Sequence, residues 1–93
     1  MDILDLRKEM DAVDRQLIDL FAQRMDIAAK IAAYKTEHQL PVYDPARESR
    51  ILEKVSACAK PGFEDYTCEL FRTLFALSRS YQNSLRERQD TSV

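Results

Sequence analysis

Residues 6–34 read LRKEMDAVDRQLIDLFAQRMDIAAKIAAY, and the apolar residues in this stretch recur at alternating intervals of four and three. Such spacing is typical of a helix that packs along a coiled-coil-like seam. One cation interrupts this seam, which consists of Leu6, Met10, Val13, Leu17, Leu20, Arg24, Ile27, Ile31 and Tyr34. The pattern predicts a single helix over residues 3–37, about 50 Å long at a rise of about 1.5 Å per residue.

This helix is too long for the domain that carries it. A compact chain of 93 residues has a radius of gyration of about 12 Å, and hence a diameter of roughly 30 Å. Part of the helix must therefore project beyond the rest of the chain, with its apolar seam uncovered. A second copy of the chain is the simplest cover for that seam. The sequence thus predicts an intertwined helical homodimer.

Prolines and the single glycine mark where the helices end. Pro41 and Pro45 bracket one break, and a Pro-Gly pair at 61–62 marks a second. Helical periodicity predicts two further helices, over residues 45–59 and 64–87. No sustained alternation of apolar and polar residues indicates a strand. The predicted fold class is all-α, with three helices per chain and a long first helix.

The second predicted helix has a clear start signal. Asp44 is its candidate N-cap, and Pro45 occupies the first helical position. No repeat or low-complexity segment divides the chain, so residues 1–93 are expected to form a single domain. Residues 86–93 are interpreted as a dispensable polar tail.

Composition excludes several classes of function. The net charge of −2 gives no general affinity for nucleic acid, and no apolar stretch approaches the ~20 residues that cross a membrane. The acidic N-terminus is unlike a signal peptide, which favours a cytoplasmic location. Cys58 and Cys68 fit that location as reduced thiols. One histidine, His38, and one glycine, Gly62, leave no metal-ligand cluster and no phosphate loop. We therefore expect no metal and no cofactor.

Arg24 occupies a seam position between Leu20 and Ile27, where a buried unpaired charge would be costly. Lys35 follows eleven residues later, about 20° around the helix, so both cations could converge on a small anion. Alternatively, Arg24 forms an inter-helix salt bridge and Lys35 is a solvated cation at the helix C-terminus. Arg7 lies roughly 25 Å from Arg24 along the helix and about 100° around it. It is either a surface cation or joins a site from the partner subunit.

Further polar residues accompany the apolar faces of the other two helices. Ser78 is the polar member of the third helix's seam, and Gln82 lies one turn beyond it. In the second helix, Arg47 and Glu48 lie one turn before its apolar residues. Each has an ordinary alternative. A serine can hydrogen-bond to a carbonyl of its own helix, Gln82 can be exposed at the edge of the seam, and a charged first turn is usually solvated.

Together these residues resemble the type II chorismate mutases, an all-helical family of aromatic amino-acid biosynthesis. The matching segments run from about Leu4 to Leu85. They are Leu6-Arg7, residues 18–24 (IDLFAQR), Lys35, residues 41–48 (PVYDPARE), Ser78 and Gln82. The resemblance implies the Claisen rearrangement of chorismate to prephenate, without cofactor or metal.

The resemblance also implies roles for the residues. Arg7 from the partner subunit and Arg24 bind substrate carboxylate, with support from Arg47 and Ser78. Glu48 accepts the hydrogen bond of the ring hydroxyl, beside Asp44. Lys35 and Gln82 donate hydrogen bonds to the ether oxygen. The implied catalytic residues are thus Lys35, Gln82 and Glu48.

Two other functions remain as alternatives. The isochorismate–pyruvate lyases resemble this family and also bind a cyclic dicarboxylate, but Glu48 and Ser78 favour the mutase. The chain could also be a non-catalytic helical dimerisation or regulatory module.

Overall fold

The structure, a computed structural model, describes residues 2–91. No strand occurs in this range, and the three helices are α1 (Ile3–Glu37), α2 (Pro45–Cys58) and α3 (Glu64–Thr91). The predicted all-α class with three helices is confirmed. Helix α3 continues four residues beyond its predicted end, and residues 86–89 of this segment are polar but good helix formers. The predicted tail is therefore helical to Thr91, and its last two residues lie outside the described range.

Local hydrogen bonds account for the break between α1 and α2. Gln39 adopts a left-handed conformation with φ of 56°, and the N–H of Leu40 returns to the carbonyl of Lys35 at 2.7 Å. Such a left-handed residue commonly ends a helix. The carboxylate of Asp44 accepts the backbone N–H of Arg47 at 3.0 Å, and a proline follows it at the first helical position. The start of α2 is thus as predicted.

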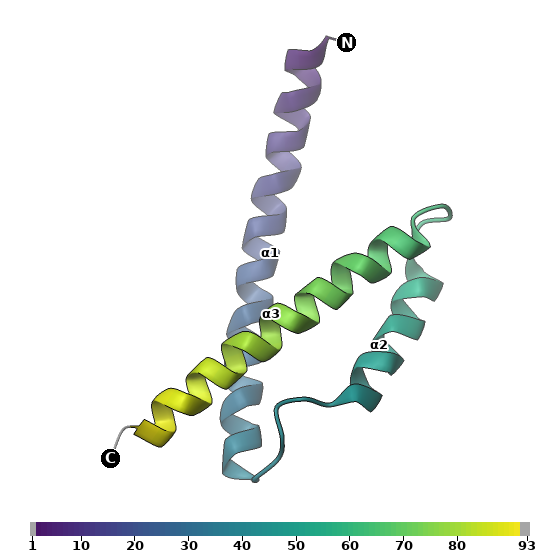
Figure 1. Ribbon diagram of the computed structural model, residues 1–93. Helices are drawn as coiled ribbons and strands as arrows, with labels where there is room; N and C mark the ends of the chain where they lie inside the picture. Colours follow the sequence, from purple (N-terminus) through teal and green to yellow (C-terminus); the bar gives the residue numbers. More distant parts are fainter. Residues whose placement is uncertain (1, 92–93) are drawn as a thin grey trace.

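Helix α1 projects far beyond the other two helices. Helix α3 crosses the C-terminal half of α1 and also packs against α2, while the N-terminal half of α1 stands alone (Figure 1). The chain measures 58 × 28 × 14 Å, and its radius of gyration of 16.8 Å exceeds the ~12 Å of a compact chain this long. The predicted overhang is confirmed.

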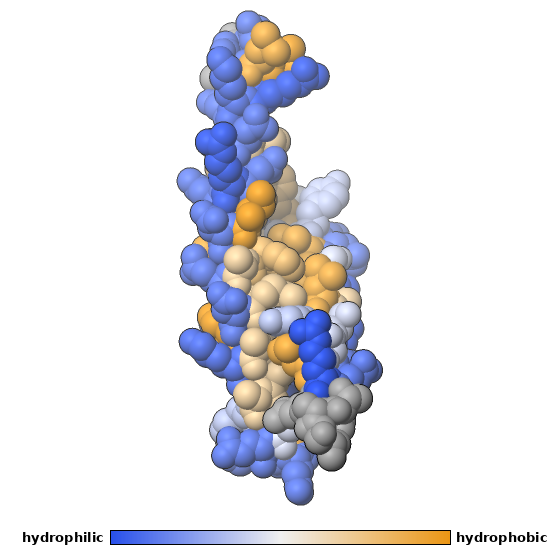
Figure 2. All heavy atoms as spheres, turned by 90° about the vertical axis from the view of Figure 1, so that its left-hand side faces the viewer, coloured by the Kyte–Doolittle hydropathy of each residue, from blue (hydrophilic) through white to orange (hydrophobic). Residues whose placement is uncertain are grey.

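The projecting arm of α1 carries uncovered apolar side chains. All residues from 2 to 23 are exposed, and apolar groups lie among the charged ones along the arm (Figure 2). They include the seam residues Leu6, Met10, Val13, Leu17 and Leu20, each 45–61% exposed. No helix in the described part of the chain is both long and apolar enough to cross a membrane.

The core lies where α3 crosses α1 and is small. Its apolar members within residues 2–91 are Ala28, Ala32, Val42 and Phe75. The two alanines let α3 approach α1 closely. The seam residues Ile27, Ile31 and Tyr34 remain exposed in the single chain. Helix α3 therefore packs mainly beside the predicted seam of α1 and leaves these three seam residues open.

Candidate active site

A pocket of about 450 Å³ lies where the three helices meet the α1–α2 loop. Small-molecule sites typically enclose about 300–1,000 Å³. Its wall contains four cations and two carboxylates, so its formal charge is +2 although the chain carries −2. The polar lining residues are Arg24, Lys35, Asp44, Arg47, Glu48, Ser78, Arg79 and Gln82. Positive charge gathered in one cleft of an acidic chain favours an anionic ligand.

Seven of the eight residues predicted for the site line this pocket, and Arg7 is the exception. Arg7 is an exposed residue of the projecting arm, roughly 25 Å along α1 from Arg24. The structure thus brings together residues from three separate segments of the chain. It leaves Arg7 outside the pocket of its own chain, as the helix geometry requires.

Arg24 is half-buried and lies against two aromatic rings of α3. Its guanidinium carbon is 5.8 Å from the ring centre of Phe75 and 6.0 Å from that of Phe71. Among residues 2–88, no carboxylate lies within ion-pair distance of it. The inter-helix salt bridge considered above is therefore not formed in this part of the chain. The aromatic faces hold the cation weakly and leave its N–H donors available to an anion.

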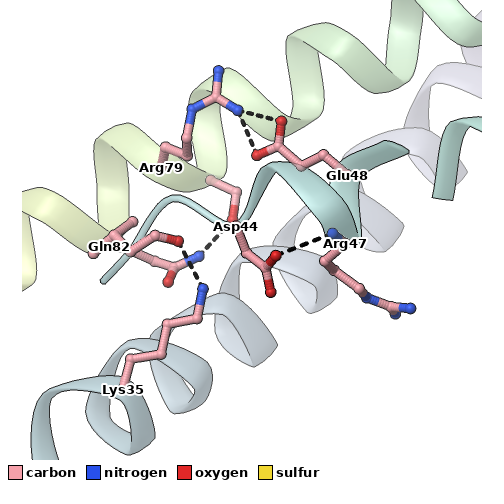
Figure 3. A network of polar contacts seen from close by, with 8 residues as sticks. Lys35, Asp44, Arg47, Glu48, Arg79 and Gln82 are labelled. Atoms are coloured by element: carbon pink, nitrogen blue, oxygen red, sulfur yellow. Dashed lines mark hydrogen bonds and ion pairs between the residues drawn. The ribbon is translucent and has the colours of Figure 1, made fainter. Parts of the chain in front are cut away.

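Lys35 is fixed inside the pocket. Its side chain extends from the last turn of α1, and Nζ donates a 2.7 Å hydrogen bond to the carbonyl of Val42 in the loop (Figure 3). The interpretation of Lys35 as a freely solvated helix-end cation is therefore wrong. An ammonium group has three donors, so two remain beyond the bond to Val42.

Ser78 and Gln82 form the buried polar wall of the pocket, only 9% and 6% exposed. The amide Nε2 of Gln82 donates to Oγ of Ser78 at 2.9 Å. The amide oxygen is buried and has no hydrogen-bond partner, an arrangement that costs about 1–3 kcal/mol. Half a turn of the amide would let its oxygen accept the Ser78 hydroxyl and would aim the NH₂ group into the pocket. The pair can therefore present a donor to a ligand.

Asp44 and Arg47 lie together at the start of α2. Both are exposed, and the carboxylate of Asp44 is engaged in capping α2. The side chain of Arg47 extends away from Lys35 and Gln82 in Figure 3. Arg47 therefore contributes its charge at the outer rim of the pocket, where a bound anion could draw it inward.

Glu48 forms an ion pair across the pocket wall with Arg79 of α3. A single guanidinium nitrogen of Arg79 donates to both carboxylate oxygens of Glu48. The two side chains are 22% and 33% exposed, so the pair is partly shielded from water. The alternative interpretation of Glu48, as a fully solvated residue in the first turn of α2, is therefore wrong. Its position in the pocket is fixed by a cation that the sequence did not single out.

Residues 6–83 match the family model described as chorismate mutase type II. The chain belongs to that family. It is 37% identical to a crystal structure of chorismate mutase from Helicobacter pylori in complex with prephenate, with a TM-score of 0.81. That likeness covers 91% of this chain and 94% of the other.

Two characterised relatives match shorter parts of the chain. The T-protein of Haemophilus influenzae is 45% identical over 49 residues, which are 53% of this chain and 13% of that protein. The 4-amino-4-deoxychorismate mutase of Streptomyces venezuelae is 37% identical over 54 residues, 58% of this chain and 52% of that enzyme. The chain thus spans about half the length of one relative and a small part of the other.

Arg79 is the polar lining residue of the pocket that was not predicted from the sequence. It follows Ser78 directly and precedes Gln82 by three positions, a spacing that places residues on neighbouring parts of one helix face. That spacing was the one sequence signal that could have indicated Arg79 as a member of the site. The pairing itself was not visible, because Glu48 is 31 residues away and only the packing of α2 against α3 brings the two together.

Proposed function

We propose that the chain catalyses the Claisen rearrangement of chorismate to prephenate. The observation that supports this best is the pocket with formal charge +2, which matches a substrate carrying two carboxylates. Membership of the type II chorismate mutase family and the likeness to a prephenate-bound enzyme support the same reaction.

The reaction needs the groups that this pocket offers. One ether C–O bond breaks as one C–C bond forms within the same molecule, so no nucleophile or proton carrier takes part. Catalysis then rests on holding the substrate in its compact conformation and on donors aimed at the negative charge that develops on the ether oxygen. The free N–H groups of Lys35 and the rotated amide of Gln82 would be those donors.

The remaining residues would bind and orient the substrate. Arg24 would bind a carboxylate with the donors that its aromatic contacts leave free. Arg47 would close over the second carboxylate from the rim, with Ser78 behind it. Glu48, beside Asp44, would accept the hydrogen bond of the ring hydroxyl.

We further propose that the active unit is a homodimer in which the partner subunit's Arg7 completes each pocket. The uncovered apolar side chains along the arm of α1 are the main support, since a monomer rarely exposes so large an apolar surface. The exposed seam residues Ile27 and Ile31 continue that surface to the pocket. An arm covering a second chain would carry Arg7 toward that chain's pocket.

Mixing two inactive variants, Arg7→Ala and Gln82→Ala, should restore up to about a quarter of wild-type activity. Half of the dimers in an equal mixture are mixed, and one of the two pockets in a mixed dimer regains both residues. Turnover after subunit exchange measures this. Lys8→Ala, which removes the neighbouring exposed cation of the arm, should keep wild-type activity by itself. No recovery after verified exchange would place Arg7 outside the partner's pocket.

A turnover assay with chorismate and, separately, isochorismate tests the function directly. Prephenate formed from chorismate is the expected product. Pyruvate and salicylate formed from isochorismate would instead indicate a lyase, and no product from either would indicate a non-catalytic dimerisation module.

A further inference from the structure

We propose, resting on the proposed function, that Arg79 is a positioning and specificity-determining residue. By holding the carboxylate of Glu48, it makes the pocket select a ring hydroxyl over a cationic amino group at the same place on the substrate. Arg79 itself would not touch the reacting atoms. The Arg79–Glu48 pair, the pocket that it lines and the cation–π contact of Arg79 with Tyr43 carry this proposal.

Three segments of the chain fix Arg79 in place. Its backbone belongs to α3, its guanidinium donates to Glu48 of α2, and the guanidinium carbon lies 5.0 Å from the ring centre of Tyr43 in the α1–α2 loop. A planar guanidinium combines stacking with hydrogen bonding in a way that an ammonium does not. The Glu48 carboxylate is therefore oriented before a substrate arrives.

The pairing leaves Glu48 able to accept a further hydrogen bond. Each carboxylate oxygen has two lone pairs, and Arg79 uses one on each oxygen. A neutral hydroxyl can donate to one of those that remain. An oriented acceptor binds such a hydroxyl without first losing the freedom of a mobile side chain.

The same pairing changes what Glu48 offers to a cation. The ion pair carries no net formal charge, because the guanidinium of Arg79 offsets the carboxylate of Glu48. An ammonium group beside Glu48 would gain the attraction of the carboxylate and meet the repulsion of Arg79 in a partly shielded place. Lys35 and Arg24 in the same pocket add to this repulsion. Discrimination between hydroxyl and ammonium therefore depends on the charge of Arg79.

The test compares chorismate with 4-amino-4-deoxychorismate, which carries an amino group in place of the ring hydroxyl. We expect the wild-type chain to favour chorismate in kcat/KM. Arg79→Gln should lower kcat/KM for chorismate by about tenfold, because Glu48 loses its orientation. It should raise the value for the amino substrate, so that the ratio of the two shifts by more than about tenfold. A merely structural role would lower both values alike.

Arg79→Lys separates charge from geometry and serves as the second variant if Arg79→Gln does not fold. It keeps the cation but replaces the planar guanidinium with an ammonium group on a more flexible side chain, so it should lower both values while retaining most of the wild-type preference. An unchanged ratio in Arg79→Gln, or a preference lost in Arg79→Lys, would overturn this inference alone. Wild-type chain that converts neither substrate would overturn the proposed function and this inference with it.

Discussion

Replacing Arg24 with alanine is expected to lower kcat/KM for chorismate by about 10³-fold, equivalent to about 4 kcal/mol. Arg24 is a half-buried cation that has no carboxylate partner in the described chain and is held only by two aromatic faces. A substrate carboxylate would therefore be its main ionic partner. Losing one member of such a shielded charge pair typically costs about 2–5 kcal/mol. Steady-state kinetics of the purified variant measure the loss.

The same variant should fold almost as well as the wild type. The contacts that Arg24 makes with Phe71 and Phe75, which the variant loses, are cation–π interactions of about 0.5–1 kcal/mol at a partly exposed site. Urea unfolding at equal protein concentration should therefore show a change of about 1 kcal/mol or less. Arg50→Ala, which removes an exposed arginine outside the pocket lining, is the matched control and should leave kinetics unchanged. An Arg24→Ala protein that unfolds readily but keeps full turnover would show that Arg24 is structural.

Replacing Gln82 with alanine is expected to lower kcat by about 10²–10³-fold with a smaller effect on KM. The amide would bond most strongly in the transition state, where the ether oxygen gains negative charge. Interactions that strengthen only there lower kcat when they are lost, whereas uniform binding contacts raise KM. An undiminished kcat would exclude Gln82 as the donor.

Gln82→Glu tests the same role through pH. A protonated carboxyl donates a hydrogen bond as the amide does, whereas an ionised one repels the developing charge. The site is almost fully buried, which raises the pKa of the introduced carboxyl group. Activity should therefore be highest at low pH and fall as pH rises through that pKa. Asn83→Asp makes the same charge change at the exposed neighbouring position and should keep the wild-type pH profile.

Local sequence signals predicted the helices well. The bounds of α1 follow from an apolar seam in which Arg24 is the one charged member, and the start of α2 follows from Asp44 and the proline after it. Helix α3 extends beyond its predicted end, because polar residues do not by themselves end a helix. Residues 86–89 are polar but form helices readily, and the backbone stays helical to Thr91.

Contacts between helices were predicted less completely. The spacing of Arg24 and Lys35 indicated that they share a face, and both line the pocket. It could not show that Lys35 would donate to Val42, because that bond depends on the path of the loop. Nor could it pair Arg79 with Glu48. The face of α1 that packs against α3 was not predicted either. That face is formed by Ala28 and Ala32, whereas the larger isoleucines beside them gave the stronger hydrophobic signal.

In the proposed homodimer, the small core described above would make the stability of the protein depend on its concentration. Only four apolar residues are buried within the described part of one copy. Their burial contributes little free energy toward folding of a single copy. Folding and association should then be a single transition between two unfolded chains and one native dimer. For such a transition each tenfold increase in protein concentration adds about 1.4 kcal/mol to the apparent free energy of unfolding. The midpoint of urea denaturation should rise accordingly, so that a cell making more of the protein would also make each molecule harder to unfold.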